Sequence, residues 1–230
     1  MVALSREAFD AIEFDAACSG DHVAAARAMT QLADTGVQTQ SMPRSEAYVR
    51  AGEQWLLADD PAAAARGFLR ALEDGGPASV DPRAPLARAL FMLGQAPDAE
   101  SLIGQLAHEP PRDARMCDLL AELLVERGDL PGALAWATAG VELCLGKTPA
   151  PVSPPLASED GSENAHNGHV VSVPRPLWAG DFATPELAEP ETPARRDENE
   201  LRLLLRLRFR IRNDLGLPED DYDRLLDGLL

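Results

Sequence analysis

Alanine and leucine recur in helix-length stretches through the first two thirds of the chain, separated by short turn-forming segments. Both residues are strong helix formers, and no alternation of apolar and polar positions typical of a strand competes with them there. Residues 126–140, ERGDLPGALAWATAG, join two such stretches through a Gly-Asp turn. The pattern predicts an all-α fold built from helical hairpins.

The turn-forming residues recur at a nearly constant spacing. Gly94 is followed five residues later by Ala99, and Gly128 is followed five residues later by Ala133, so these two units are offset by 34 residues. Asp59 takes the turn position of an earlier unit, 35 residues before Gly94. A period of this length is typical of a helix-turn-helix repeat, whose hairpins stack to bury their apolar faces. We therefore expect a stacked array rather than one isolated hairpin.

The first unit carries the fullest motif, with aromatic and small residues at the spacing of a known signature. The matching residues are Tyr48, Gly52, Trp55, Ala64, Phe68 and Ala71. On these residues the chain resembles the tetratricopeptide repeat family. The resemblance implies an antiparallel helix-hairpin solenoid over residues 1–146, with an irregular first hairpin. Gly140 stands where the family has alanine, so we expect looser packing in the third unit.

The composition changes after residue 146. Residues 147–195 are rich in Pro, Ser, Gly and acidic residues, which predicts a flexible linker. Within it, the segment 170–182 is an alternative candidate for an extended strip docked on the repeats. Residues 196–230 are predicted to form a basic amphipathic helix that ends near Gly216, followed by a short acidic helix from about residue 218. Apolar and basic residues alternate over 205–212, which also fits a strand, but the stretch 201–205 is too continuously apolar for a simple one-sided strand and favours a helix.

The overall layout also resembles actinobacterial tetratricopeptide proteins related to proteins that carry a cysteine-bearing SEC-C tail. The stretch behind this resemblance is RLRFRIRNDLGLPEDDYD, residues 206–223. The chain has no such cysteines near its C-terminus, so the zinc-dependent role of that tail does not transfer. The resemblance implies a bacterial, cytoplasmic protein.

The net charge and the cysteine content bear on which ligands the protein binds and on where it is located. The formal net charge is −17, which opposes nonspecific binding to the phosphate backbone of a nucleic acid. Cys18, Cys117 and Cys144 are odd in number and widely spaced, which indicates reduced thiols rather than a disulfide framework. Acidic residues occur too early for a secretory signal, and no run of about 18 apolar residues is present to cross a bilayer. We expect a cytoplasmic location and no membrane span.

The sequence contains no phosphate-binding loop, dinucleotide-binding glycine pattern, paired zinc-binding cysteines or nucleophile elbow. His166 and His169 stand three residues apart within the expected linker, where solvated side chains are a better interpretation than metal ligands. We therefore expect a non-catalytic protein with no cofactor and no metal. An enzyme with dispersed catalytic residues stays open as an alternative.

The resemblance implies that the first helix of each hairpin lines an inner groove, where a partner binds. Residues 1–146 carry 11 basic and 22 acidic residues, whereas residues 201–212 carry five arginines and no acid. We expect the groove to bind a basic or amphipathic segment, with the chain's own C-terminal helix as one candidate occupant. The candidate partner-binding residues are Glu53, Arg88, Phe91, Met92, Glu122 and Glu126 in the groove and Arg202, Arg206 and Arg210 on the C-terminal helix. Two alternatives stay open: a merely solvated charged surface, and a regulatory or nucleic-acid-associated protein that uses the arginine helix.

Overall fold

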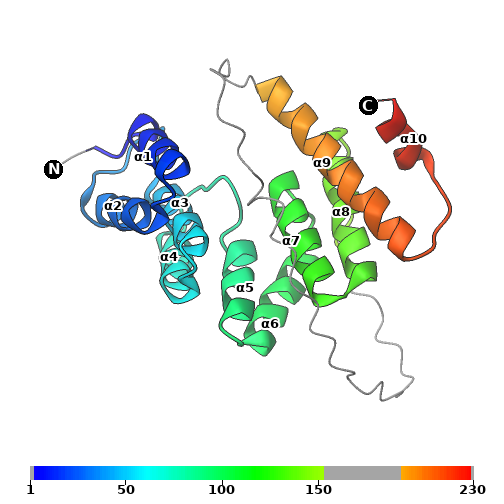
Figure 1. Cartoon of the computed structure of the whole chain (residues 1–230), viewed down its shortest axis with the longest axis horizontal. Coiled ribbons are helices and arrows are strands. Elements are labelled where there is room, and N and C mark those ends of the chain that lie inside the picture. The colour runs from blue at the N-terminus through cyan, green and yellow to red at the C-terminus, as the bar shows by residue number, and fades with distance from the viewer. Residues whose placement is uncertain (1–2, 153–192, 229–230) are drawn as a thin grey trace.

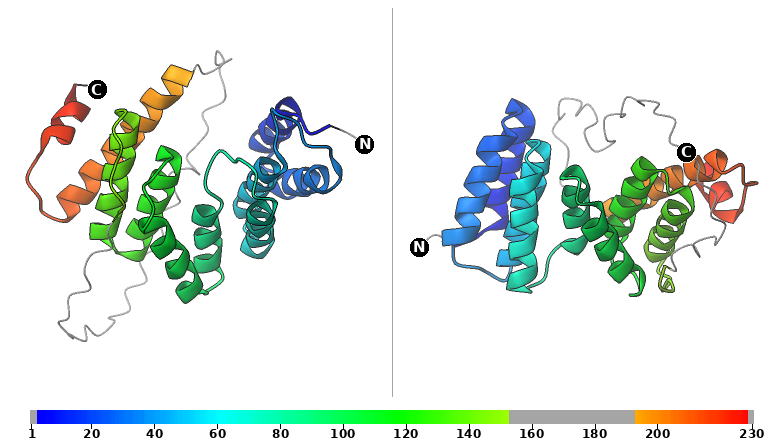
Figure 2. Two further views of the ribbon diagram at one scale, coloured as in Figure 1. Left: turned by 180° about the vertical axis from the view of Figure 1, so that it is seen from behind. Right: turned by 90° about the horizontal axis from the view of Figure 1, so that it is seen from below.

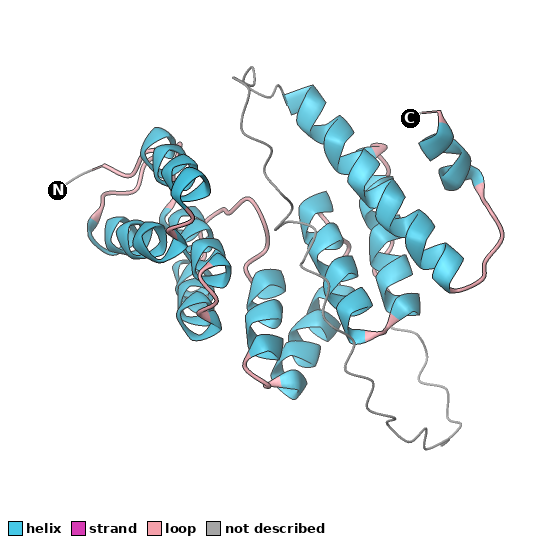
Figure 3. Cartoon of the chain, viewed as in Figure 1, coloured by secondary structure: helices cyan, strands magenta, loops and turns pink. Residues whose placement is uncertain are grey.

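The computed structural model describes residues 3–152 and 193–228. Apart from one isolated β-bridge between Ala3 and Val37, the described residues form only helices, turns and loops (Figure 3). The helices are α1 (Arg6–Ser19), α2 (His22–Thr35), α3 (Arg44–Leu57), α4 (Pro61–Asp74), α5 (Arg83–Met92), α6 (Ala96–Ala107), α7 (Ala114–Arg127), α8 (Leu130–Cys144), α9 (Pro193–Asp214) and α10 (Asp221–Asp227). The prediction of an all-α helical-repeat fold is confirmed.

The helices follow one another through the molecule as a stacked array. Each even-numbered helix from α2 to α8 packs against the helices before and after it in the chain, apart from α6, whose main contacts are with α5. In the three ribbon views, α1 and α2 lie at one end of the array and α9 and α10 at the other (Figures 1 and 2). The first two helices of the chain therefore form one end of the array, and the last two form the other end.

The turns of the hairpins lie where the sequence spacing predicts them. Gly94 and Gly128 have φ angles of 73° and 80°, and Asp59 is the single non-glycine residue with positive φ in the described chain, at 58°. Glycine adopts this left-handed conformation without steric penalty, and aspartate tolerates it better than most residues. A left-handed residue at each turn lets the chain reverse within two or three residues, which brings the two helices of a hairpin together.

Local capping explains why the second helix of a hairpin starts immediately after the turn. The Asp60 side chain accepts a hydrogen bond of 2.8 Å from the backbone N–H of Ala63, and Pro61 begins α4. The Asp129 side chain accepts a hydrogen bond of 3.0 Å from the N–H of Gly132 at the start of α8. An acidic cap satisfies an otherwise unpaired N–H and complements the positive end of the helix dipole.

The core of the array is made mainly of small residues with a few large ones between them. Gly52 of α3 lies against the Phe68 ring of α4, where an added Cβ would fall 2.5 Å from a ring carbon. Phe9, Met29, Leu120 and Trp136 are also buried. Small residues at the crossings let helix axes approach closely, and the large side chains fill the space on either side.

The C-terminal arginine-rich segment is helical, as expected, and the strand alternative over 205–212 is wrong. Helix α9 ends at Asp214, and α10 starts at Asp221. Leu204, Leu207 and Ile211 are buried where α9 packs on α8 and α7. Helix α9 thus continues the array beyond the repeats predicted for residues 1–146. The expected linker, with the docked-strip alternative and the two linker histidines, falls almost entirely on residues 153–192, outside the described residues.

Candidate functional site

Ion pairs connect the odd-numbered helices on one side of the array. Arg50 of α3 donates to Glu13 of α1 through Nε at 2.7 Å and through Nη2 at 2.5 Å, and to Asp10 at 2.6 Å. The Arg50 side chain is only 9% exposed. Because α2 separates α1 from α3 in the chain, these bonds join the first helices of two neighbouring hairpins.

The same arrangement recurs between the next odd-numbered helices. Arg88 of α5 donates to Glu126 of α7 at 2.5 Å and lies 4.0 Å from Glu122, one helical turn earlier. A second contact reaches further, because Arg115 of α7 lies 3.9 Å from Glu53 of α3. Helices α4, α5 and α6 come between these two helices in the chain, so this contact joins hairpins that are not neighbours in the sequence.

We call this surface the charged face. It comprises Asp10, Glu13, Arg50, Glu53, Arg88, Arg115, Asp118, Glu122 and Glu126. Six of these residues are acidic and three are basic. The arginines are engaged with acids of the same face, so the excess of negative charge is available to a cation from outside.

Burial shifts the protonation of the acids at the centre of this face. Burial, against the charge of Arg115 and with smaller contributions from the carboxylates of Glu13 and Glu46, raises the pKa of Glu53 to about 7. Burial, with the charges of Glu122 and Glu200, raises the pKa of Asp118 to about 7. These carboxyl groups are therefore partly protonated at neutral pH, and they lack enough positive charge around them to hold them fully ionised.

The pKa of Glu122 is also raised, chiefly by burial and against the positive charge of Arg88. The charge of Arg210 on α9 lowers this pKa, which shows that the C-terminal helix carries one arginine near the α7 end of the charged face. A cation that binds beside Glu53, Asp118 and Glu122 would favour their ionised forms. The face is thus chemically suited to an arginine- or lysine-bearing ligand.

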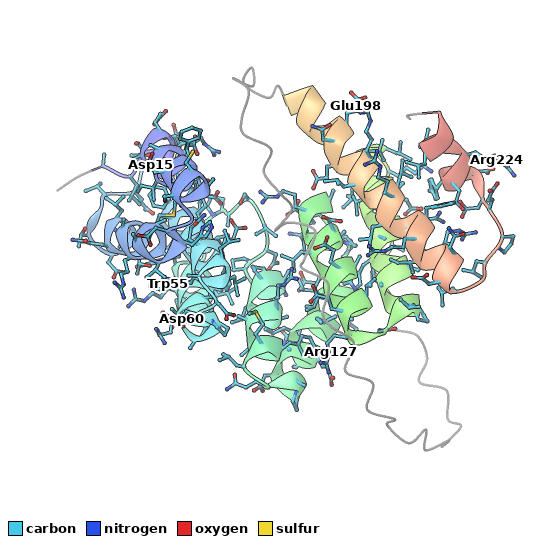
Figure 4. All side chains as sticks on the ribbon, viewed as in Figure 1. Asp15, Trp55, Asp60, Arg127, Glu198 and Arg224 are labelled. Atoms are coloured by element: carbon cyan, nitrogen blue, oxygen red, sulfur yellow. The ribbon has the colours of Figure 1, made fainter. Side chains whose placement is uncertain are left out.

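The structure brings four of the six predicted groove residues together. Glu53, Arg88, Glu122 and Glu126 all lie on the charged face. Phe91 is half-buried, and the guanidinium of Arg127 stacks at 4.7 Å from its ring centroid, near the end of α7 that Figure 4 labels. Met92, the last residue of α5, is 47% exposed.

The three predicted arginines of α9 do not form the contact that holds this helix on the array. Arg202 pairs with Glu198 of the same helix at 2.7 Å, and Arg206 and Arg210 are exposed. The apolar stripe beside them faces α8 instead. Desolvating three arginines is costlier than burying leucine and isoleucine, so the apolar side of the amphipathic helix is the one that packs.

A different arginine is buried, one that sequence reasoning does not find. Arg208 is 4% exposed and donates to Asp220 at 2.5 Å, to Asp223 at 3.3 Å and to the Thr138 hydroxyl of α8 at 3.0 Å. Its guanidinium also lies 4.8 Å from the ring centroid of Tyr222. The sequence feature that could have indicated this buried arginine is the alternation of basic and apolar residues over 205–212, followed by the acids at 219–223. The acids that follow the helix return to pair with it.

The other polar candidates have structural partners. His22 shares a hydrogen bond of 2.9 Å with the Gln54 side chain, and His108 lies beside the backbone carbonyl of Gly104 in its own helix. Within residues 3–152 and 193–228, no cluster of three or more His, Cys, Asp or Glu side chains is arranged to hold a metal. No described helix combines the length and apolarity needed to cross a membrane.

Comparison with protein-family models, with curated proteins and with solved structures finds no match in any of the three.

Proposed function

We propose that this chain is a non-catalytic protein-recognition module of the tetratricopeptide type, which binds a cationic, amphipathic segment of another protein on its charged face. The observation that carries the proposal is the excess of acids on α3 and α7, held with raised pKa values around Glu53 and Asp118. Acids that serve only to hold helices together would be expected beside a partner arginine. Arg115 lies 3.9 Å from Glu53 and acts on both acids, but its charge does not offset their burial, and an incoming lysine or arginine would supply more positive charge.

Apolar side chains beside the acids favour an amphipathic ligand over a simple cation. Leu56, Leu119 and Val125 are half-buried at positions of α3 and α7 that the repeat pattern assigns to the groove, and Met92 is exposed at the end of α5. A helix that presents lysines or arginines with leucines between them would meet both kinds of group.

The ligand in this proposal comes from another molecule. Helix α9 is the chain's own basic amphipathic helix, but its apolar stripe, including Leu204 and Ile211, is already buried as part of the array. Binding it again on the charged face would require that stripe to be exposed. We further propose a bacterial cytoplasmic setting, which the three unlinked cysteines support because a reducing compartment keeps thiols free.

The test is a calorimetric titration of the full chain with two designed helical peptides of equal length, one with lysine and leucine and one with glutamate and leucine in the same pattern. We expect the lysine peptide to bind and the glutamate peptide not to bind. Replacing Glu53 and Glu122 together by glutamine should weaken binding of the lysine peptide about tenfold, since two carboxylates of the face are lost.

The matched control removes two exposed glutamates from even-numbered helices, as Glu73→Gln with Glu100→Gln in α4 and α6. It makes the same change in net charge but leaves the charged face intact. Equal loss of affinity in both double variants would show that only net charge matters and would contradict a site on α3 and α7. Equal helix content by circular dichroism confirms that both variants are folded.

A further inference from the structure

The last long helix of the array presents a basic face that no described residue of the chain packs against. Leu203 and Phe209 are 57% and 36% exposed, and Arg206 and Arg210 are exposed beside them. The other sides of α9 are occupied, because Leu204 and Ile211 pack on the preceding helices and Arg208 is held by α10. Two large apolar side chains among arginines on an open helix face are typical of a docking surface.

The first helix of the array presents a face of the opposite charge. Phe14 of α1 is 57% exposed, and Glu7, Ala11 and Asp15 are exposed around it. The opposite side of α1 is buried through Phe9. Figure 4 places Asp15 on α1, at the end of the array away from α9 and α10.

The two faces match in spacing as well as in charge. Glu7, Ala11 and Asp15 form a stripe with a period of four residues, and Arg202, Arg206 and Arg210 form a stripe with the same period. In both stripes the outer members are eight residues apart, about 12 Å along a helix. Acids and arginines at equal separation can therefore pair at both ends of one helix-to-helix contact.

The aromatic residues stand in equivalent places on the two helices. Phe14 precedes Asp15, and Phe209 precedes Arg210. When the charged stripes face each other, each ring lies at the edge of the contact, where it covers apolar surface of the other helix. The apolar and ionic parts of the two faces are thus arranged alike.

From these matches we propose that the exposed face of α9 binds the exposed face of α1 in a second copy of this chain. The two faces lie at opposite ends of the array, so the contact joins unlike surfaces and leaves one of each free (Figure 2). Such an interface is heterologous and extends into head-to-tail oligomers. This inference uses neither Glu53 nor Glu122, although Arg210 lies near Glu122 at the edge of the charged face.

The association should depend on concentration and remain weak. A single pair of helix faces is smaller than the interfaces of permanent dimers, and the charge of −17 on each chain opposes the approach of two copies. At an ionic strength of about 0.15 M the screening length is about 8 Å, so the long-range repulsion is reduced more than the contacts between paired side chains.

The test is analytical ultracentrifugation of the full chain at increasing concentration in 0.15 M salt. Two double variants carry reversed charges at the outer positions of each stripe, one on the first face, Glu7→Arg with Asp15→Arg, and one on the last, Arg202→Glu with Arg210→Glu. The control, Arg27→Glu with Arg66→Glu, reverses two exposed arginines on α2 and α4. We expect the wild type and the control to associate and each face variant alone to stay at 24.7 kDa.

An equimolar mixture of the two face variants should associate again. The reversed first face of one variant then meets the reversed last face of the other, and the two unaltered faces also match. A misfolded variant could not regain association on mixing, so this result separates loss of charge pairing from loss of fold. A wild type that stays monomeric at all concentrations, a face variant that associates like the control, or a mixture that stays monomeric would each overturn the proposal.

Discussion

Gly140 of α8 lies directly beneath Leu204 of α9, so closely that a Cβ on Gly140 would fall 2.9 Å from both δ carbons of that leucine and 3.0 Å from the Cβ of Cys117. The sequence pattern predicts loose packing here, because glycine replaces the alanine expected at this position of a repeat. The structure shows the reverse. The missing methyl group makes room for a helix from a distant part of the chain.

Gly140→Ala should therefore push α9 away from α8 and destabilise the fold by about 1 to 3 kcal/mol, the usual cost of overpacking. The matched control is Gly104→Ala in α6, where a Cβ meets nothing within 4 Å. That change should stabilise the protein by up to about 1 kcal/mol, because alanine is the better helix former. Denaturant unfolding of both variants measures the contrast, and equal effects would contradict the close crossing.

The buried arginine of α9 leads to a second prediction. Arg208→Leu removes one of the two guanidinium partners of Asp223, which is 5% exposed and stays paired with Arg212 at 3.0 Å, and should destabilise the fold by about 1 to 3 kcal/mol. Arg224→Gln removes an ion pair with Asp221 in which both side chains are well exposed, and should cost less than about 1 kcal/mol. Thermal unfolding distinguishes the two. A small effect of Arg208→Leu would mean that α10 contributes little to the folded state.

These two sites show what the sequence predicts and what it leaves open. The turns at Asp59, Gly94 and Gly128 follow from local spacing and backbone preference, so the hairpins are predictable. The pairing of Arg88 with Glu126 spans 38 residues and depends on how hairpins stack, which no local rule fixes. The repeat period therefore predicts which charged residues line the candidate site. It does not predict which of them pair with one another.

The side of α9 that packs could not be predicted for a related reason. The helix has an arginine stripe, which could pair with acidic residues of the array, and a stripe of leucine and isoleucine, which could pack on its apolar residues. The choice depends on the crossing at Gly140 and on the acids after Gly216, which return to neutralise Arg208. The first lies in α8, far from α9 in the sequence, and the second lies beyond the turn that follows α9.

The raised pKa of Asp118 gives a third prediction, on pH and stability. The folded state holds a proton on this carboxyl up to about pH 7, whereas an unfolded aspartate loses it near pH 3.8. The folded state therefore binds more protons between these values, and the free energy of unfolding falls as the pH rises from about 4 to about 7.

Asp118→Asn removes this penalty because the amide carries no charge. The variant should be more stable than the wild type by about 1 to 2 kcal/mol at pH 8, after allowance for solvent screening, and should lose this advantage at pH 4.5. The exposed Asp15→Asn serves as control and should differ from the wild type by less than about 0.5 kcal/mol at both pH values. An advantage of Asp118→Asn that does not change with pH would contradict a buried, proton-holding carboxyl.

The same carboxyl groups connect stability to ligand binding. A lysine or arginine placed beside Glu53 and Asp118 favours their ionised forms and lowers both pKa values from about 7. Binding of the lysine-leucine peptide at pH 6.5 should then release about 0.5 to 1.5 protons for each peptide bound, because the free protein holds most of these protons at that pH. Titrations in buffers that differ in ionisation enthalpy measure this number directly.

At pH 9 both carboxyl groups are already ionised, so the proton release should vanish while binding persists. The variant Glu53→Gln with Asp118→Asn should release almost no protons at pH 6.5, whereas the exposed Glu73→Gln with Glu100→Gln should release as many as the wild type. Release that persists in the first variant would place the cation beside other acids of the chain. Binding without any release would mean that the peptide does not reach the centre of the charged face, since no cation can approach these two carboxyl groups without shifting their titration.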